Sequence, residues 1–90
     1  MTRSITHNPQ EHRFELTEDQ TTSLIDYELD GNTMVITHTR VPEKVGGRGI
    51  AGDMTRFALD TARENNWRVR PVCSYAEAWI KRHPEYQDLL

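Results

Sequence analysis

The sequence predicts an α+β domain with the element order β-β-β-α-β-α. Three runs of alternating apolar and polar residues come first, as in strands that bury one face of a sheet. A glycine cluster then leads into a long run with apolar residues at helical spacing, and a further strand-like run and a second helical run follow. A chain of 90 residues makes one small domain, so residues 1–90 are expected to form a single unit.

The alternating runs predict an antiparallel meander. They occupy residues 13–18, 22–29 and 33–38. Residues 1–12 have no clear period and are expected to be an extended or frayed lead-in. A turn at residues 18–20 separates the first two strands, and Asp-Gly-Asn at residues 30–32 is a strong hairpin signal because Gly and Asn tolerate positive φ. Short turns between successive strands favour antiparallel pairing.

The first helix is expected at residues 49–65, with one apolar face packed on the sheet. That face consists of Ile50, Met54, Phe57, Ala58, Thr61 and Ala62. An Asn65-Asn66 pair ends the helix, since Asn is the usual substitute for Gly at a left-handed cap.

The remaining chain adds a strand at residues 67–73 and a second helix at residues 74–82. A strand that follows a strand and a helix is expected to lie parallel to the earlier strand through a right-handed crossover. Ser74 and Glu77 have the spacing of a capping box at the helix start. A His-Pro pair ends the helix, and residues 85–90 add a short helical turn.

Composition favours a soluble globular protein, with 36% apolar and 28% charged residues. No apolar run approaches the roughly 20 residues of a membrane span, and the polar first ten residues do not resemble a signal peptide. The single cysteine excludes an internal disulfide and fits a reducing compartment, so a cytoplasmic location is expected. One cysteine and four scattered histidines have no zinc-site spacing, so no metal is expected.

Charge is unevenly distributed along the chain. Residues 1–39 hold two basic and seven acidic side chains, and residues 40–90 hold nine basic and seven acidic ones. A net charge of −3 argues against a nucleic-acid-binding surface, whereas the basic surplus suits a small anionic ligand. A chance distribution over a solvated surface is the alternative. So small a domain gains stability from a ligand or a second copy, so a monomer or weak dimer is expected.

A glycine-rich turn joins the third strand to the first helix. Gly46, Gly47 and Gly49 leave backbone N–H groups uncovered, and the helix N-terminus adds unpaired donors and a partial positive charge. Such a turn is a ready phosphate site. The alternative is that the glycines only shape a tight turn.

The strand, turn and helix resemble the acyl-coenzyme A signature of the GNAT superfamily of N-acetyltransferases. That signature reads Gln or Arg, any two residues, Gly, any residue, Gly or Ala. This sequence matches it at Gly49 and Ala51 and departs from it at Gly46, where Arg48 partly replaces the missing charge. The chain is similar to the very short, single-domain branch of the superfamily at residues 38–42 (HTRVP), the glycine-rich turn, residues 71–74 (PVCS) and residues 83–86 (HPEY).

The resemblance implies a minimal GNAT-like fold, in which the third and fourth strands are a splayed parallel pair that forms the acyl-CoA cleft. The exposed backbone of Thr39, Arg40 and Val41 would pair with the pantetheine arm. The pyrophosphate would be held by the N–H groups of Gly46, Gly47, Arg48, Gly49, Ile50 and Ala51.

Three residues are candidates for acetyl transfer. Cys73 ends the fourth strand before a helix start, where a thiol has a lowered pKa, so it could accept the acetyl group, act as an acid or line the tunnel. A buried apolar filler is the alternative. His38 ends the third strand and suits a general base, unless it is only a strand histidine. Tyr75 ranks third, as a proton donor.

The sequence therefore predicts an acetyl-CoA-binding N-acetyltransferase that acts on an unidentified amine, with a protein lysine as one class of acceptor. The alternative is a catalytically weak or inactive CoA-binding sensor or partner module. A plain interaction domain is the third hypothesis. Larger members of the superfamily carry helices after their first strand, and these help to form the acceptor site. This chain has a short turn there, so the acceptor side is expected to be open or completed by a partner.

Overall fold

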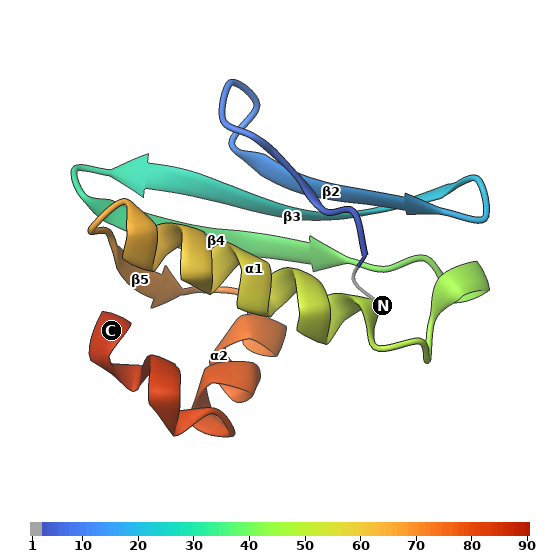
Figure 1. Cartoon of the computed structure of the whole chain (residues 1–90). Helices are drawn as coiled ribbons and strands as arrows, with labels where there is room; N and C mark the ends of the chain where they lie inside the picture. The colour runs from blue at the N-terminus through green and yellow to red at the C-terminus, as the bar shows by residue number, and fades with distance from the viewer. Residues whose placement is uncertain (1–2) are drawn as a thin grey trace.

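The computed structural model describes residues 3–90 as a five-stranded sheet with two helices packed on one face (Figure 1). The strands lie in chain order, from β1 at one edge to β5 at the other. They are β1 (Thr6–Asn8), β2 (Arg13–Glu18), β3 (Thr21–Asp30), β4 (Thr33–Arg40) and β5 (Arg68–Pro71). The helical elements are η1 (Glu43–Val45), α1 (Ile50–Glu64), α2 (Ser74–Lys81) and η2 (Pro84–Leu89).

The predicted meander and crossover are both confirmed. Strands β2, β3 and β4 pair antiparallel, and β5 pairs parallel with β4 after the α1 crossover. Asp19 and Gln20 both have positive φ, as a two-residue turn matched to the twist of a hairpin requires. Gly31 takes the left-handed conformation in the second hairpin turn, with φ of 60°.

The lead-in prediction was wrong for residues 6–8, which form the edge strand β1. This strand pairs antiparallel with β2, placing His7 opposite Phe14. Three residues before a proline are too few to show an alternating pattern, so only the partner strand reveals β1. The fourth predicted strand is also shorter than expected, because the ladder to β4 ends where Ile36 faces Pro71.

Helix α1 buries the predicted apolar face against the sheet, with one exception. Phe57 is 37% exposed and makes a T-shaped contact with the Phe14 ring, whereas Thr55 and Leu59 are buried instead. Both threonines on the buried face, Thr55 and Thr61, donate to carbonyls one turn back in the helix, which satisfies their hydroxyls.

Within residues 3–90, no helix is long and apolar enough to cross a membrane.

The helix ends agree with the sequence at α1 and differ at α2. Asn66 has φ of 59° and donates to the Arg63 carbonyl, which confirms the predicted left-handed cap. The capping box was wrong, because Cys73 rather than Ser74 occupies the N-cap position and no side chain caps the helix. The second helix therefore begins with its first backbone N–H groups directed toward the end of β5.

Candidate functional site

Strands β4 and β5 stop pairing after Ile36 and diverge. The candidate site lies around the gap between the two diverging strands. The N–H groups of Val72 and Cys73 both donate to the Ile36 carbonyl, each at 3.0 Å. Beyond that point β4 continues to Arg40 paired only with β3, and no described strand pairs with its other edge. The structure thus has the splayed parallel pair that the sequence predicts.

A β-bulge at Thr37 marks the point of divergence. His38 lies opposite Asp26, whereas Ile36 lies opposite the next residue, Tyr27, so Thr37 is the extra residue. The Thr37 hydroxyl donates to the Asp26 carbonyl at 3.2 Å. Because a bulge bends its strand and increases the local twist, it turns β4 away from β5.

The glycine-rich turn presents a continuous row of backbone donors. Gly47 and Gly49 both have φ of 79°, a conformation that residues with a side chain rarely adopt. None of residues 3–90 provides an acceptor for the six N–H groups from Gly47 to Gly52. Gly46 differs, since its N–H donates to the Glu43 carbonyl at 3.1 Å. The donor row therefore lies one residue further along the chain than the sequence indicates.

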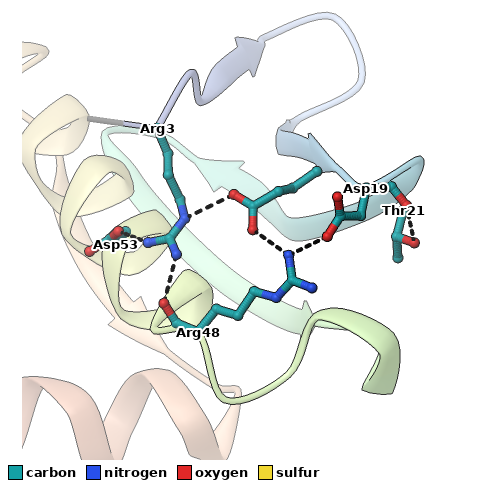
Figure 2. A network of polar contacts seen from close by, with 6 residues as sticks. Arg3, Asp19, Thr21, Arg48 and Asp53 are labelled. Carbon is teal, nitrogen blue, oxygen red and sulfur yellow. Dashed lines mark hydrogen bonds and ion pairs between the residues drawn. The ribbon is translucent and has the colours of Figure 1, made fainter. Parts of the chain in front are cut away.

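An ion-pair network surrounds this row (Figure 2). Arg3 donates to the Arg48 carbonyl at 2.6 Å, to Glu18 at 3.3 Å and to the Asp53 carboxylate. The Arg48 guanidinium donates to Glu18 at 2.9 Å and to Asp19 at 2.6 Å. The side chain of Arg48, expected to replace a lost charge, is thus held by two carboxylates of the β2–β3 turn.

Cys73 lies across the divergence from β4, with its Sγ 3.5 Å from the Thr39 hydroxyl. Burial raises the pKa of this thiol, but hydrogen bonding with the Thr39 hydroxyl and with the backbones of Ala76, Tyr75 and Thr39 outweighs burial, so the pKa lies below its ordinary value. The Thr39 hydroxyl and, after it, the start of α2 therefore lower the pKa of the thiol, which is the direction that the sequence predicts for a thiol at a helix N-terminus.

Tyr75 lies between Cys73 and the donor row. A β-carbon at Gly52 would be 3.8 Å from the Tyr75 hydroxyl and 3.5 Å from the indole nitrogen of Trp79, so α2 packs closely against the first turn of α1. Burial raises the pKa of the Tyr75 phenol above its ordinary value. The positive charge of Arg82 lowers this pKa, and the nearby Cys73 raises it, but both effects are smaller than that of burial. The phenol is thus protonated at neutral pH, as a proton donor must be.

His38 lies on the other side of the sheet from this group. Cross-strand partners share a face, so His38 lies with Asp26 on the exposed face, while Thr39 lies with buried Ile25 on the helical face. The structure therefore brings Cys73, Thr39 and Tyr75 together and does not add His38 to them. His38 instead flanks the same bulge from the outer face.

Sequence patterns missed two parts of the site. The Thr39 hydroxyl beside Cys73 depends on the bulge, which has no local signature in the sequence. The pairing of Arg3 and Glu18 with the glycine-rich turn joins segments 30 to 50 residues apart. The only related signal in the sequence is the basic surplus in the second half of the chain, and it does not indicate which residues pair.

A separate hollow of about 250 Å³ lies at the C-terminal end of α1. It is lined by Arg63, Asn66, Trp67, Arg68, Asp88 and Leu89. None of the predicted site residues lines it, so the hollow does not belong to the candidate site.

Comparisons with known proteins agree on one family. The sequence profile of the GCN5-related N-acetyl-transferase family matches residues 13–89. Protein NATD1 of Bos taurus is 38% identical over 64 residues, and Protein NATD1 of Gallus gallus is 36% identical over the same length. The matched segment is 70% of this chain and 57% and 58% of those relatives, so the chain spans less than two thirds of their length.

A solved structure extends the likeness to the whole fold. The NMR structure of a GCN5-like protein from Staphylococcus aureus matches with a TM-score of 0.77 at 29% identity. The match covers 96% of this chain and 85% of that one.

Proposed function

This chain belongs to the GCN5-related N-acetyltransferase family, and on that premise we propose that it binds acetyl-coenzyme A and transfers the acetyl group to an amine. The family membership agrees with the superfamily resemblance of the glycine-rich motif. We include a protein lysine as the acceptor class to test first, because the outer face of the sheet is open to a large substrate.

One observation carries the proposal: the unpaired edge of β4 beyond Ile36 runs toward the row of free N–H groups at residues 47–52. The backbone of Thr39, Arg40 and Val41 would pair with the amides of the pantetheine arm. The donors of the turn and the α1 dipole would hold the pyrophosphate. A thioester at the end of such an arm would lie near Cys73, which contacts Thr39.

The chemistry divides between the two faces of the sheet. The coenzyme supplies an activated acetyl thioester. On the helical face, Tyr75 would give a proton to the departing thiolate, and Cys73 would either line the site or take the acetyl group by thioester exchange. On the outer face, His38 would remove a proton from the incoming amine before its nitrogen attacks the carbonyl carbon.

A CoA-binding sensor or partner module without turnover is the second candidate. The observation that favours it is the short turn between β1 and β2: among residues 3–90, no helix follows the first strand to help build an acceptor site. The same absence would make a partner protein necessary for catalysis. The proposal for either function includes a reducing compartment such as the cytoplasm, where the Cys73 thiol stays reduced.

Calorimetric titration with acetyl-coenzyme A tests binding, and release of free thiol with an amine present tests turnover. Saturable binding with thiol release supports the enzyme, and binding without release on a panel of amines and lysine peptides supports the sensor. No binding at millimolar ligand would contradict both. Mass spectrometry after mixing with acetyl-coenzyme A alone separates the mechanisms, since an acetyl-cysteine adds about 42 Da at Cys73.

A further inference from the structure

The donor row at the α1 N-terminus is surrounded by more negative than positive charge. The two arginines of the network, Arg3 and Arg48, face three carboxylates, those of Glu18, Asp19 and Asp53. The cluster therefore carries one net negative charge at the place where the proposed function requires a doubly charged pyrophosphate. Left unchanged, this arrangement would repel the ligand.

The two arginines are nonetheless already within reach of the turn. Arg3 bonds to the carbonyl of Arg48 within the turn and to Asp53 in the first turn of α1, and Arg48 belongs to the turn itself (Figure 2). Rotation of each guanidinium would exchange a carboxylate oxygen for a phosphate oxygen, because a guanidinium donates charge-assisted hydrogen bonds to either group.

We propose that Glu18 and Asp19 act as an acidic latch, which occupies Arg48 and Arg3 in the free protein and competes with the pyrophosphate of the coenzyme for them. Arg3 is then a phosphate-binding residue contributed by the N-terminal segment. The inference rests on the proposed function, because the coenzyme supplies the pyrophosphate that would replace the carboxylates as the partner of the two arginines.

The latch is present at neutral pH and is able to open. The hydrogen bond from Arg48 is the largest influence on the pKa of Glu18, and burial, which opposes it, is the second; with the hydrogen bond from Arg3 added, the pKa lies below its ordinary value, so the carboxylate stays charged. The Asp19 side chain is 57% exposed and Glu18 is 31% exposed, so both carboxylates can return to water when the arginines leave. Exposed ion pairs are weak, so the competition is expected to change affinity by several-fold rather than by orders of magnitude.

The test measures the dissociation constant of coenzyme A for the wild type, Glu18→Gln and the double variant Glu18→Gln/Asp19→Asn. Glu28→Gln is the matched control, because it makes the same charge change at an exposed β3 position and, within residues 3–90, Glu28 pairs with no cation. We expect binding to tighten by about threefold to tenfold in the latch variants and to stay within about 1.5-fold of wild type in the control.

Two further arms identify the competing group. Dephospho-coenzyme A keeps the pyrophosphate and lacks the 3′-phosphate, so it should show the same gain in the latch variants. Arg3→Gln should weaken binding of both ligands. A gain confined to coenzyme A, or unchanged affinity in Arg3→Gln, would overturn the assignment to the pyrophosphate.

The outcomes separate the latch from the proposed function. Equal or weaker binding in folded latch variants overturns the latch while wild-type binding upholds the function, with folding checked by thermal melts. If no variant binds, the latch and the proposed function both fail.

Discussion

The Cys73 thiol is acidified by groups from two separate elements. Thr39 comes from β4, and the N–H groups of Tyr75 and Ala76 come from the first turn of α2. The helix start is visible in the sequence, whereas the Thr39 contact exists only because the strands diverge at the bulge. The contribution of the Thr39 hydroxyl is removable by a single substitution that leaves the backbone N–H groups of α2 in place.

Thr39→Val should raise the pKa of Cys73, because it removes a hydroxyl that bonds to the thiolate and leaves the burial that opposes ionisation. Alkylation by iodoacetamide follows the thiolate fraction, so its rate profile should move to higher pH. Thr39→Ser keeps the hydroxyl and should keep the wild-type profile. An unchanged profile in Thr39→Val would mean that the helix start alone acidifies the thiol.

His38→Gln should lower acetyl transfer by roughly 10²-fold, the usual contribution of a general base, with little change in coenzyme affinity. The reason is its position on the outer face, from which the amine would approach while the coenzyme would bind on the helical side. His12→Gln is the control, since His12 is exposed in the β1–β2 turn. A variant that keeps its rate would remove His38 from the mechanism, and loss of coenzyme binding would make it part of the cleft wall.

At the scale of the elements, local patterns predicted most of the fold. Alternation, turn residues and helical spacing gave β2 to β5 and both helices, and the crossover rule gave the parallel pair. Strand β1 and the bulge at Thr37 could not be predicted, because both are defined by pairing to another strand. The capping box failed for a related reason: the helix start is fixed by hydrogen bonds to Ile36 that lie outside the local sequence.

Gly49→Val should weaken acetyl-coenzyme A binding by at least about tenfold, or 1.4 kcal/mol. A β-carbon there meets no protein atom within 4 Å, so the side chain would project into the open space that the ligand would use. Its φ of 79° adds strain of about 1–2 kcal/mol for a residue with a β-carbon. Calorimetric titration of the folded variant gives the affinity.

Gly31→Val is the matched control for the glycine-rich turn. Gly31 also has positive φ and also has open space around a β-carbon, but it lies in the β3–β4 hairpin. Both variants should lose stability to a similar degree, and only Gly49→Val should lose affinity. Equal losses of affinity would attribute the effect to strain rather than to the turn.

At the scale of the whole molecule, the described residues form a sheet with β1 at one edge and helices packed on one face (Figure 1). Strand β1 pairs with β2 and covers its outer edge. Within β1, the His7 ring stacks on the Phe14 ring with 4.5 Å between the centroids, and its Nε2 lies 2.6 Å from the Tyr27 hydroxyl. Burial, and then the nearby His12, lowers the pKa of His7. The neutral imidazole is therefore the form that fits this edge.

His7 should make the folded protein less stable in mild acid. Since its folded pKa is lowered, the unfolded chain binds more protons, and the stabilisation is complete above the ordinary histidine pKa of about 6.5. It is lost as pH falls through that value, and the loss levels off below the folded pKa. In melts from pH 8 to pH 5, His7→Gln should reduce the fall in Tm and His12→Gln should reduce it less, because His12 is the smaller cause. Parallel curves for wild type and His7→Gln would place the acid sensitivity elsewhere in the sheet.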